Sequence, residues 1–136
     1  MLSLLYVSVS TLSETTAIGE VDALVTRAMA KNASLAITGA LMFTGTEFAQ
    51  ALEGDENRVD ALMREIYLDS RHRCVTIVRR SPITVRRFDG WSLAYSGGAS
   101  YVGRPIKSLL QPNVKIQIQD VHRVQELMEG LAASLA

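Results

Sequence analysis

Apolar positions along the chain follow two different periods, one typical of strands and one typical of helices. Five runs rich in apolar and β-branched residues predict strands: Leu2–Val9, Leu35–Phe43, Glu47–Glu53, Cys74–Val78 and Trp91–Tyr95. A short glycine-containing link, Thr44-Gly45-Thr46, joins the second run to the third. Such a link predicts that these two strands form an antiparallel hairpin.

Three further segments carry apolar residues at spacings of three and four, which places them on one stripe of a helix. The stripes are Val21, Leu24, Val25, Ala28 and Met29; Val59, Leu62, Met63, Ile66 and Tyr67; and Val124, Leu127, Met128, Leu131 and Leu135. We expect Thr16, Asp55 and Asp120 to cap the N-termini of these helices and Asn32 to close the first one. A Gly- and Pro-bearing stretch over residues 97–112 precedes the last helix.

The element order β-α-β-β-α-β-β predicts an α+β, ferredoxin-like fold with a five-stranded mixed sheet. Right-handed connections would place the first two helices on one face, with strands one and three as parallel neighbours. The C-terminal helix, or a second subunit, would cover the opposite face. We therefore predict a core domain over residues 1–97 and a C-terminal helical extension over residues 98–136.

Composition and charge disfavour several classes of function. A chain of 136 residues has no room for a second catalytic module, and its 14 basic and 14 acidic residues leave no electrostatic footprint for nucleic acid. Apolar runs are far shorter than the about 20 residues that cross a bilayer, and no signal peptide opens the chain, so we expect a cytoplasmic protein. Cys74 has no cysteine partner; we expect it to pack in the interior, with no disulfide and no metal site.

Two polar side chains occupy strand positions where apolar ones are expected. Phe48, Gln50 and Leu52 share one face of the third strand, so Gln50 is flanked by large apolar groups. A buried carboxamide without partners costs about 1–3 kcal/mol, which means that Gln50 requires a hydrogen bond. Tyr6 sits among apolar residues of the first strand and can face the same helix layer. Each residue is explained either as a satisfied core residue or as part of a ligand site.

Polar residues at the ends of the first two helices offer complementary hydrogen-bonding groups. We expect both helices to run from the same end of the sheet, which would bring Asn32 together with Arg71 and His72. An amide and a guanidinium fork can read an N–H beside two carbonyls on a planar ligand, with Val25 and Ile66 against its faces. Taken singly, an Asn such as Asn32 is most often a helix terminator, and a pair such as Arg71-His72 is most often a solvated helix end.

Several segments in the right order and spacing resemble the BLUF family, the sensors of blue light using FAD, over residues 2–96. These segments are Leu5-Tyr6-Val7-Ser8, Asn32 with Ile37-Thr38-Gly39-Ala40-Leu41, Phe48-Ala49-Gln50-Ala51-Leu52-Glu53-Gly54, Asp69-Ser70-Arg71-His72 and Arg86-Arg87-Phe88-Asp89-Gly90-Trp91-Ser92. The resemblance implies an FAD cofactor whose carbonyl edge is bound by Asn32 and Arg71. It also places Lys31, His72, Ile37, Val25, Phe48 and Ile66 around the flavin.

The resemblance further implies a photoreceptor without substrate turnover, and hence not an enzyme. Tyr6 would be the photochemical electron and proton donor, and Gln50 would end rotated or tautomerised with a new bond to the flavin C4 carbonyl, causing a red-shifted absorption. Trp91 and Leu93 on the fifth strand would relay the change to an unidentified downstream protein. Family members commonly carry Met where this chain has Leu93, which offers no sulfur acceptor. Trp91 is equally explained as packing against the C-terminal helix.

Two other functions compete with this one. A chromophore-free ferredoxin-like binding or assembly module would use Tyr6, Gln50 and Arg71 as structural residues, and it would be colourless. An acylphosphatase-like hydrolase is disfavoured because residues 8–13 contain no glycine to cradle a phosphate. The apolar stripe of the C-terminal helix additionally suggests a homo-oligomer. Composition does not distinguish FAD from FMN.

Overall fold

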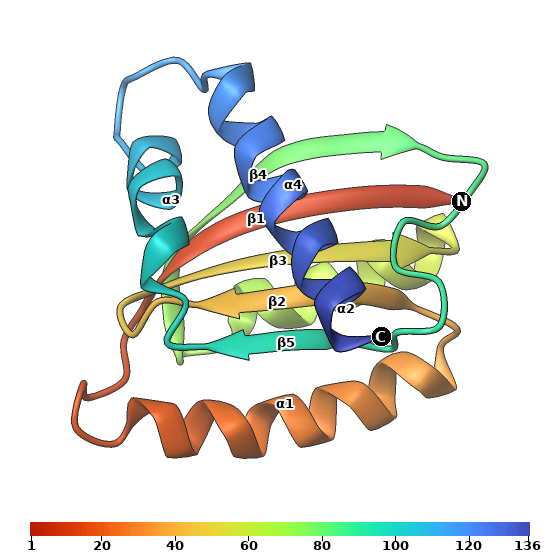
Figure 1. The fold of residues 1–136 in the computed structure, drawn as a ribbon, viewed down its shortest axis with the longest axis horizontal. Helices are drawn as coiled ribbons and strands as arrows, with labels where there is room; N and C mark the ends of the chain where they lie inside the picture. Colours follow the sequence, from red (N-terminus) through yellow and green to blue (C-terminus); the bar gives the residue numbers. More distant parts are fainter.

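Five strands form one sheet in the computed structural model, which describes residues 1–136 (Figure 1). The strands are β1 (Leu2–Ser10), β2 (Thr38–Phe43), β3 (Glu47–Gly54), β4 (His72–Pro82) and β5 (Ala94–Gly97). The helices are α1 (Ala17–Ser34), α2 (Glu56–Leu68), α3 (Gly103–Leu109) and α4 (Ile118–Leu135), with a short 3₁₀ turn at Ser100–Val102. None of the helices combines the length and apolar character needed to span a lipid bilayer.

The sheet has the strand order β4-β1-β3-β2-β5 and confirms the predicted mixed α+β fold. Only β5 pairs in parallel, with β2, and every other pair is antiparallel. The prediction that the first and third strands are parallel is therefore wrong. Helix α1 carries the chain back so that β2 runs in the direction of β1, and the hairpin through Gly45 then reverses β3.

Helices α1 and α2 cover the same face of the sheet but run in opposite directions. Helix α1 leads from the end of β1 to the start of β2, whereas α2 starts where β3 ends and leads to β4. Because Thr38 pairs with Glu53, and His72 pairs with Ser10 at the other end of the sheet, the two helices are antiparallel. The expectation that Asn32 and Arg71 lie at the same end of the helix layer is thus wrong.

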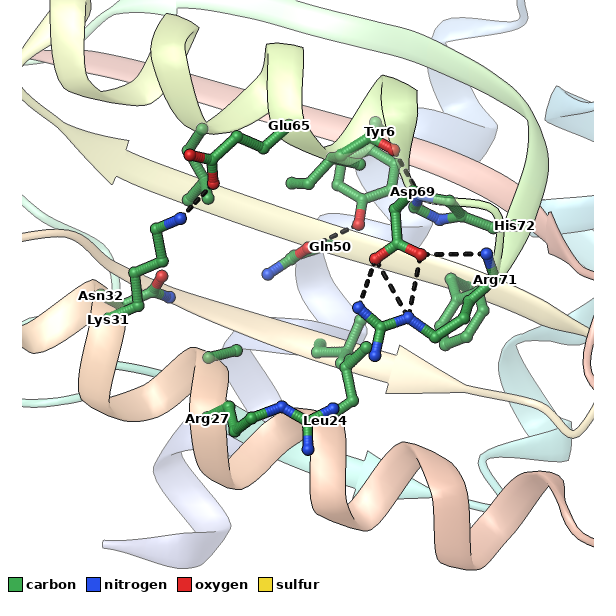
Figure 2. Close-up of a pocket in the computed structure, with 15 residues that line it drawn as sticks. Tyr6, Leu24, Arg27, Lys31, Asn32, Gln50, Glu65, Asp69, Arg71 and His72 are labelled. Carbon is green, nitrogen blue, oxygen red and sulfur yellow. Dashed lines mark hydrogen bonds and ion pairs between the residues drawn. The ribbon is translucent and has the colours of Figure 1, made fainter.

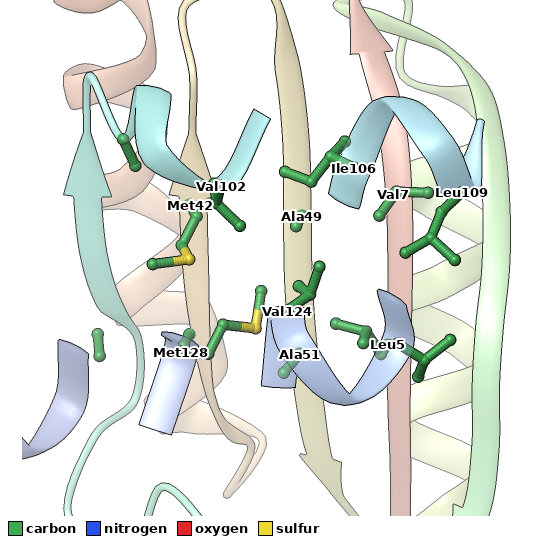
Figure 3. Packing of buried hydrophobic residues seen from close by; sticks show 14 of the residues in the cluster. Leu5, Val7, Met42, Ala49, Ala51, Val102, Ile106, Leu109, Val124 and Met128 are labelled. Carbon is green, nitrogen blue, oxygen red and sulfur yellow. The ribbon is translucent and has the colours of Figure 1, made fainter. Parts of the chain in front are cut away.

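Helices α3 and α4 cover the opposite face, as predicted for the C-terminal helix (Figure 1). Figure 3 shows Val124 and Met128 of α4 and Ile106 of α3 above the strands. Strand β3 contributes only Ala49 and Ala51 to this cluster, which leaves room for the helices to pack closely. The stripe of α4 therefore faces its own sheet and no longer argues for self-association. The division at residue 97 stays a prediction.

Several element boundaries differ from the predicted ones. The last strand begins at Ala94, so Trp91 precedes it, and β2 begins at Thr38 rather than Leu35. Residues 103–109 form α3, although the sequence predicts a link there; Pro105 is tolerated because first-turn N–H groups need no helical acceptor. Helix α4 begins at Ile118, two residues before the predicted cap Asp120.

Cys74 is exposed, which contradicts the expectation that it packs in the interior. Its φ of 55° is left-handed, and it lies where the β1–β4 register shifts between Val7 and Val9. Such a bulge interrupts the alternation of faces along a strand. The apolar and β-branched pattern of residues 74–78 contains no signal for this irregularity, so the sequence assigned Cys74 to the wrong environment.

Glu53, a carboxylate with only 1% of its surface exposed, ties the chain before Trp91 to the end of β3. Its Oε1 accepts hydrogen bonds from the Phe88 N–H at 2.7 Å and the Thr38 hydroxyl at 2.8 Å. Its Oε2 accepts from the Arg87 N–H at 2.9 Å. Arg86 adds a bond to the Glu53 main-chain oxygen at 3.0 Å. These bonds hold residues 86–88 against the sheet.

Replacing Glu53 with Gln should destabilise the fold by about 1–3 kcal/mol, because an NH₂ group would replace an acceptor that faces backbone donors. Urea unfolding measures this as a lower midpoint with an unchanged slope. Glu14→Gln, at an exposed loop position, is the matched control and should leave the midpoint unchanged. Equal midpoints for the two variants would show that the Glu53 bonds contribute nothing measurable.

Candidate functional site

A cavity of about 220 Å³ opens between α1, α2 and the sheet (Figure 2). Strands β1, β2 and β3 supply its floor, and the two helices supply its walls. The lining consists of Tyr6, Leu41, Phe48 and Gln50 from the strands; Leu24, Arg27, Ala28, Lys31 and Asn32 from α1; and Leu62, Glu65, Ile66, Asp69, Arg71 and His72 from α2 and the residues after it. The walls are mainly apolar, whereas the polar groups lie on the floor and at the rim.

Tyr6 and Gln50 meet on the floor of this cavity. They are directly opposite each other in the β1–β3 ladder, and the Tyr6 hydroxyl donates to Gln50 Oε1 at 2.5 Å (Figure 2). Burial, and secondarily the Asp69 carboxylate, raises the pKa of Tyr6 well above its usual range, which keeps the phenol protonated. Gln50 Nε2 has no protein partner and points into the cavity. The pair is thus internally bonded on one side and open on the other.

Asn32 lies at one end of the cavity, in the last turn of α1, with only 1% of its surface exposed. Its Nδ2 donates to the main-chain oxygen of Ser92 at 2.9 Å, while no protein group donates to its Oδ1. The amide therefore joins the cavity to the segment that precedes β5. This contact, rather than closure of the helix, accounts for an Asn at this position, since α1 continues to Ser34.

Arg71 and His72 lie at the other end of the cavity, and both are engaged by protein groups. Arg71 forms a two-pronged pair with Asp69, with Nη2 and Oδ2 2.6 Å apart, and this pairing lowers the pKa of Asp69 and raises that of Arg71. His72 Nε2 lies 2.8 Å from the Ile66 carbonyl, so it carries the proton, and Nδ1 accepts from Ser8 at 3.1 Å. The His72 ring is therefore T-shaped to the Tyr6 ring and has no free ring nitrogen.

The structure brings together eight of the predicted site residues and separates two from them. Tyr6, Gln50, Asn32, Arg71, His72, Lys31, Phe48 and Ile66 line the cavity. Val25 and Ile37 do not; each is buried in an apolar cluster beside it. On α1, Leu24, Ala28 and Lys31 line the cavity. The helix packs on the sheet through a neighbouring face that contains Val21 and Val25.

Seven charged or apolar lining residues were not singled out as site residues from the sequence: Leu24, Arg27, Ala28, Leu41, Leu62, Glu65 and Asp69. Arg27 and Lys31 are four residues apart on α1, a spacing that places them on one helix face. That spacing is a usable signal. The ion pair between Lys31 and Glu65 across the mouth of the cavity could not be predicted from the sequence, because it joins two separate helices.

Trp91 and Leu93 flank the site without lining it. Trp91 packs against the cluster that α3 and α4 form on the far face of the sheet. Leu93, with 1% of its surface exposed, belongs instead to the cluster that contains Leu41 and Phe48, two residues of the cavity floor. The position of Trp91 agrees with its explanation as a packing residue. Of Trp91 and Leu93, only Leu93 lies on the cavity side of the sheet.

Comparison with known proteins assigns this arrangement to a family. The sequence model of the BLUF family, described as sensors of blue-light using FAD, matches residues 1–94. The chain belongs to the BLUF family. It is 35% identical over 75 residues to the photoactivated adenylate cyclase subunit beta of Euglena longa, a match that spans 54% of this chain and 9% of that protein. The chain thus corresponds to a small part of the cyclase subunits it matches.

Solved structures show the same BLUF fold. A dark-state structure of the BLUF protein BlrB is 29% identical in sequence and matches with a TM-score of 0.76. The match covers 98% of this chain and 96% of BlrB. BlrP1 of Klebsiella pneumoniae, solved with FMN and cyclic diGMP, is 39% identical with a TM-score of 0.64, covering 71% of this chain and 26% of BlrP1. The BlrB match includes the residues of this chain beyond 94, which the family model does not reach.

Tyr6 should stay protonated in alkaline solution for as long as the chain stays folded. Tyrosinate absorbance near pH 10, the ordinary pKa of a phenol, should therefore be equal in the native chain and in Tyr6→Phe. When both proteins are unfolded in urea at this pH, the native sequence should show one more tyrosinate than Tyr6→Phe. Because only the unfolded state releases this proton, stability should fall as the pH rises above about 10. A difference of one tyrosinate between the folded proteins near that pH would contradict the prediction.

Proposed function

We propose that this protein is a blue-light photoreceptor that binds a flavin in the cavity between α1 and α2. One observation carries the proposal: Tyr6 and Gln50 are hydrogen-bonded to each other on the cavity floor, while Gln50 Nε2 is left as an open donor. Because this donor faces the open cavity rather than a protein acceptor, a ligand in the cavity can supply the acceptor.

The groups around the cavity fit a flavin ring. Gln50 Nε2 is a free donor and Asn32 Oδ1 a free acceptor, a combination that matches carbonyl and N–H groups on the edge of a planar heterocycle. Arg71 can add donors if it gives up part of its pairing with Asp69. Apolar groups of Leu24, Ala28 and Ile66 offer surfaces for the ring faces. A cavity of about 220 Å³ suits the ring system alone, so the tail of FAD, our preferred cofactor, would extend past the rim.

Tyr6 is proposed as the photochemical donor. A bound flavin would supply absorption of blue light and, when excited, an acceptor for an electron and a proton from this residue. Burial raises the pKa of the neutral phenol, so Tyr6 does not give up its proton alone. Loss of an electron would make the phenol a much stronger acid, and its Oη proton already points along the short hydrogen bond to Gln50 Oε1, which can pass it on toward the flavin. Loss of the two particles is thereby coupled within one hydrogen-bonded pair.

Gln50 is proposed as the switch. Its amide presents oxygen to Tyr6 and nitrogen to the cavity. Rotation of the amide, or conversion to its imidic tautomer, would change what Gln50 offers to each side after the proton and electron have returned to Tyr6. We propose that the altered amide makes a new bond to the C4 carbonyl of the ring. Nothing is consumed, so we propose a sensor rather than an enzyme.

The proposed output path leaves the cavity through Asn32. Asn32 Nδ2 donates to the main-chain carbonyl of Ser92, which lies between Trp91 and Leu93. A displacement of the Asn32 side chain would therefore act directly on that segment of the chain. Trp91 lies against the helices on the opposite face of the sheet, and Leu93 lies on the cavity side. We propose that residues 1–97 form the sensor and that residues 98–136 present its state to a partner protein. A colourless chain that binds no flavin would favour a chromophore-free binding module instead.

Tyr6→Phe should keep bound flavin and the fold but lose the light-induced red shift, because the phenol oxygen and its proton are gone. Absorption spectra before and after blue light measure the shift. Tyr67→Phe, at a half-exposed position on α2 outside the cavity, is the matched control and should behave like the native chain. A normal red shift in Tyr6→Phe would remove Tyr6 from the donor role.

Gln50→Leu should likewise bind flavin and stay folded, yet show no red-shifted state, because leucine provides neither donor nor acceptor to exchange. The same spectra test this, and circular dichroism checks the fold. Gln125→Leu, on the far face of the sheet, controls for the loss of an amide elsewhere. Persistence of a full photocycle in Gln50→Leu would show that the switch lies in another residue.

A further inference from the structure

The rim of the cavity carries more positive charge than its ion pairs neutralise. Arg71 is paired with Asp69 at one end, and Lys31 is paired with Glu65 across the mouth between the two helices. Arg27 is the only arginine, lysine, aspartate or glutamate of the lining outside these two pairs, and it takes part in no hydrogen bond or ion pair (Figure 2). The rim thus retains one uncompensated cation, and this cation is on α1.

Arg27 and Lys31 lie one helical turn apart on α1 and both border the cavity. Both side chains are exposed, so each can reorient at small cost. Both residues lie at the solvent-exposed rim of the cavity, whereas the amides and apolar groups that would bind a flavin ring lie deeper. A ligand with an uncharged ring and an anionic tail would therefore contact apolar walls inside the cavity and two basic side chains at its rim. Of these two, Arg27 has no ion-pair partner.

We propose that Arg27, together with Lys31, forms a phosphate-binding rim that makes this protein prefer phosphorylated flavins over riboflavin. The inference rests on the proposed flavin site. A guanidinium binds phosphate oxygens through two parallel N–H groups, and an ammonium adds a point charge beside them. The first phosphate after the ribityl chain is common to FMN and FAD, so the rim recognises both.

Glu65 opposes this recognition. Its carboxylate neutralises Lys31 and stands across the mouth from α1, where it repels an anionic tail. Phosphate binding therefore requires Lys31 to exchange partners, from the Glu65 carboxylate to the phosphate. Two substitutions that each remove one charge from the rim should consequently change phosphate affinity in opposite directions. Such opposite signs would not follow from a general loosening of the cavity.

Titration of the flavin-free full-length chain with riboflavin, FMN and FAD, followed by flavin fluorescence, tests the proposal without using photoactivity. Arg27→Gln should raise the dissociation constants of FMN and FAD about fivefold and leave that of riboflavin within about twofold, as expected for one exposed charge contact. Glu65→Gln should lower the FMN and FAD constants and leave riboflavin unchanged. Arg64→Gln, an exposed α2 arginine outside the cavity, is the matched control and should change none of them.

Added salt should reduce the advantage of FMN over riboflavin in the native chain, because exposed charge contacts are screened, and should reduce it less in Arg27→Gln, where only Lys31 remains to contact the phosphate. Equal affinities for riboflavin and FMN in the native chain, or equal losses for all three flavins in Arg27→Gln, would overturn the phosphate rim while leaving the flavin site intact. Failure of every flavin to bind the native chain would overturn the proposed function itself. The two failures are therefore distinguishable.

Discussion

The register between β1 and β3 is the constraint on which the site depends. Tyr6 faces Gln50 because these residues are directly opposite in an antiparallel ladder, and side chains alternate between faces along each strand. A slip of one residue in either strand would turn its polar side chain toward α4. The large apolar side chains on one face and the alanines of β3 on the other resist such a slip, since neither helix layer could pack against the exchanged surface.

The two faces of the sheet have different tasks, and their packing reflects this. The α4 face is a continuous apolar cluster, whereas the α1 and α2 face is divided into two smaller clusters with the cavity between them. A divided helix layer leaves polar groups without protein partners, at the positions of the Gln50 and Asn32 amides. The continuous cluster on the other face therefore holds the larger share of the apolar core.

One stretch of chain contacts both faces. Residues 86–93 are held at their start by the buried carboxylate of Glu53 and near their end by Asn32. Phe88 at the first anchor and Trp91 between the two pack on the α4 side, and Leu93, directly after the second anchor, packs on the cavity side. A displacement at the second anchor therefore has a physical connection to the far face, whereas the first anchor limits how far the displacement spreads.

The sequence by itself determined which residues share a face, because alternation and helical spacing are local properties of the backbone. Tyr6 and Gln50 were placed toward one helix layer, and the element order and mixed sheet followed from the same patterns. Only the tertiary structure decided the direction of β3 relative to β1, the antiparallel course of α1 and α2, and the resulting separation of Asn32 from Arg71. It also decided that Leu24 and Ala28, rather than Val25, border the cavity, and that the β4 bulge exposes Cys74. Each of these depends on how two distant segments pack or pair, and periodicity within one segment carries no information about that.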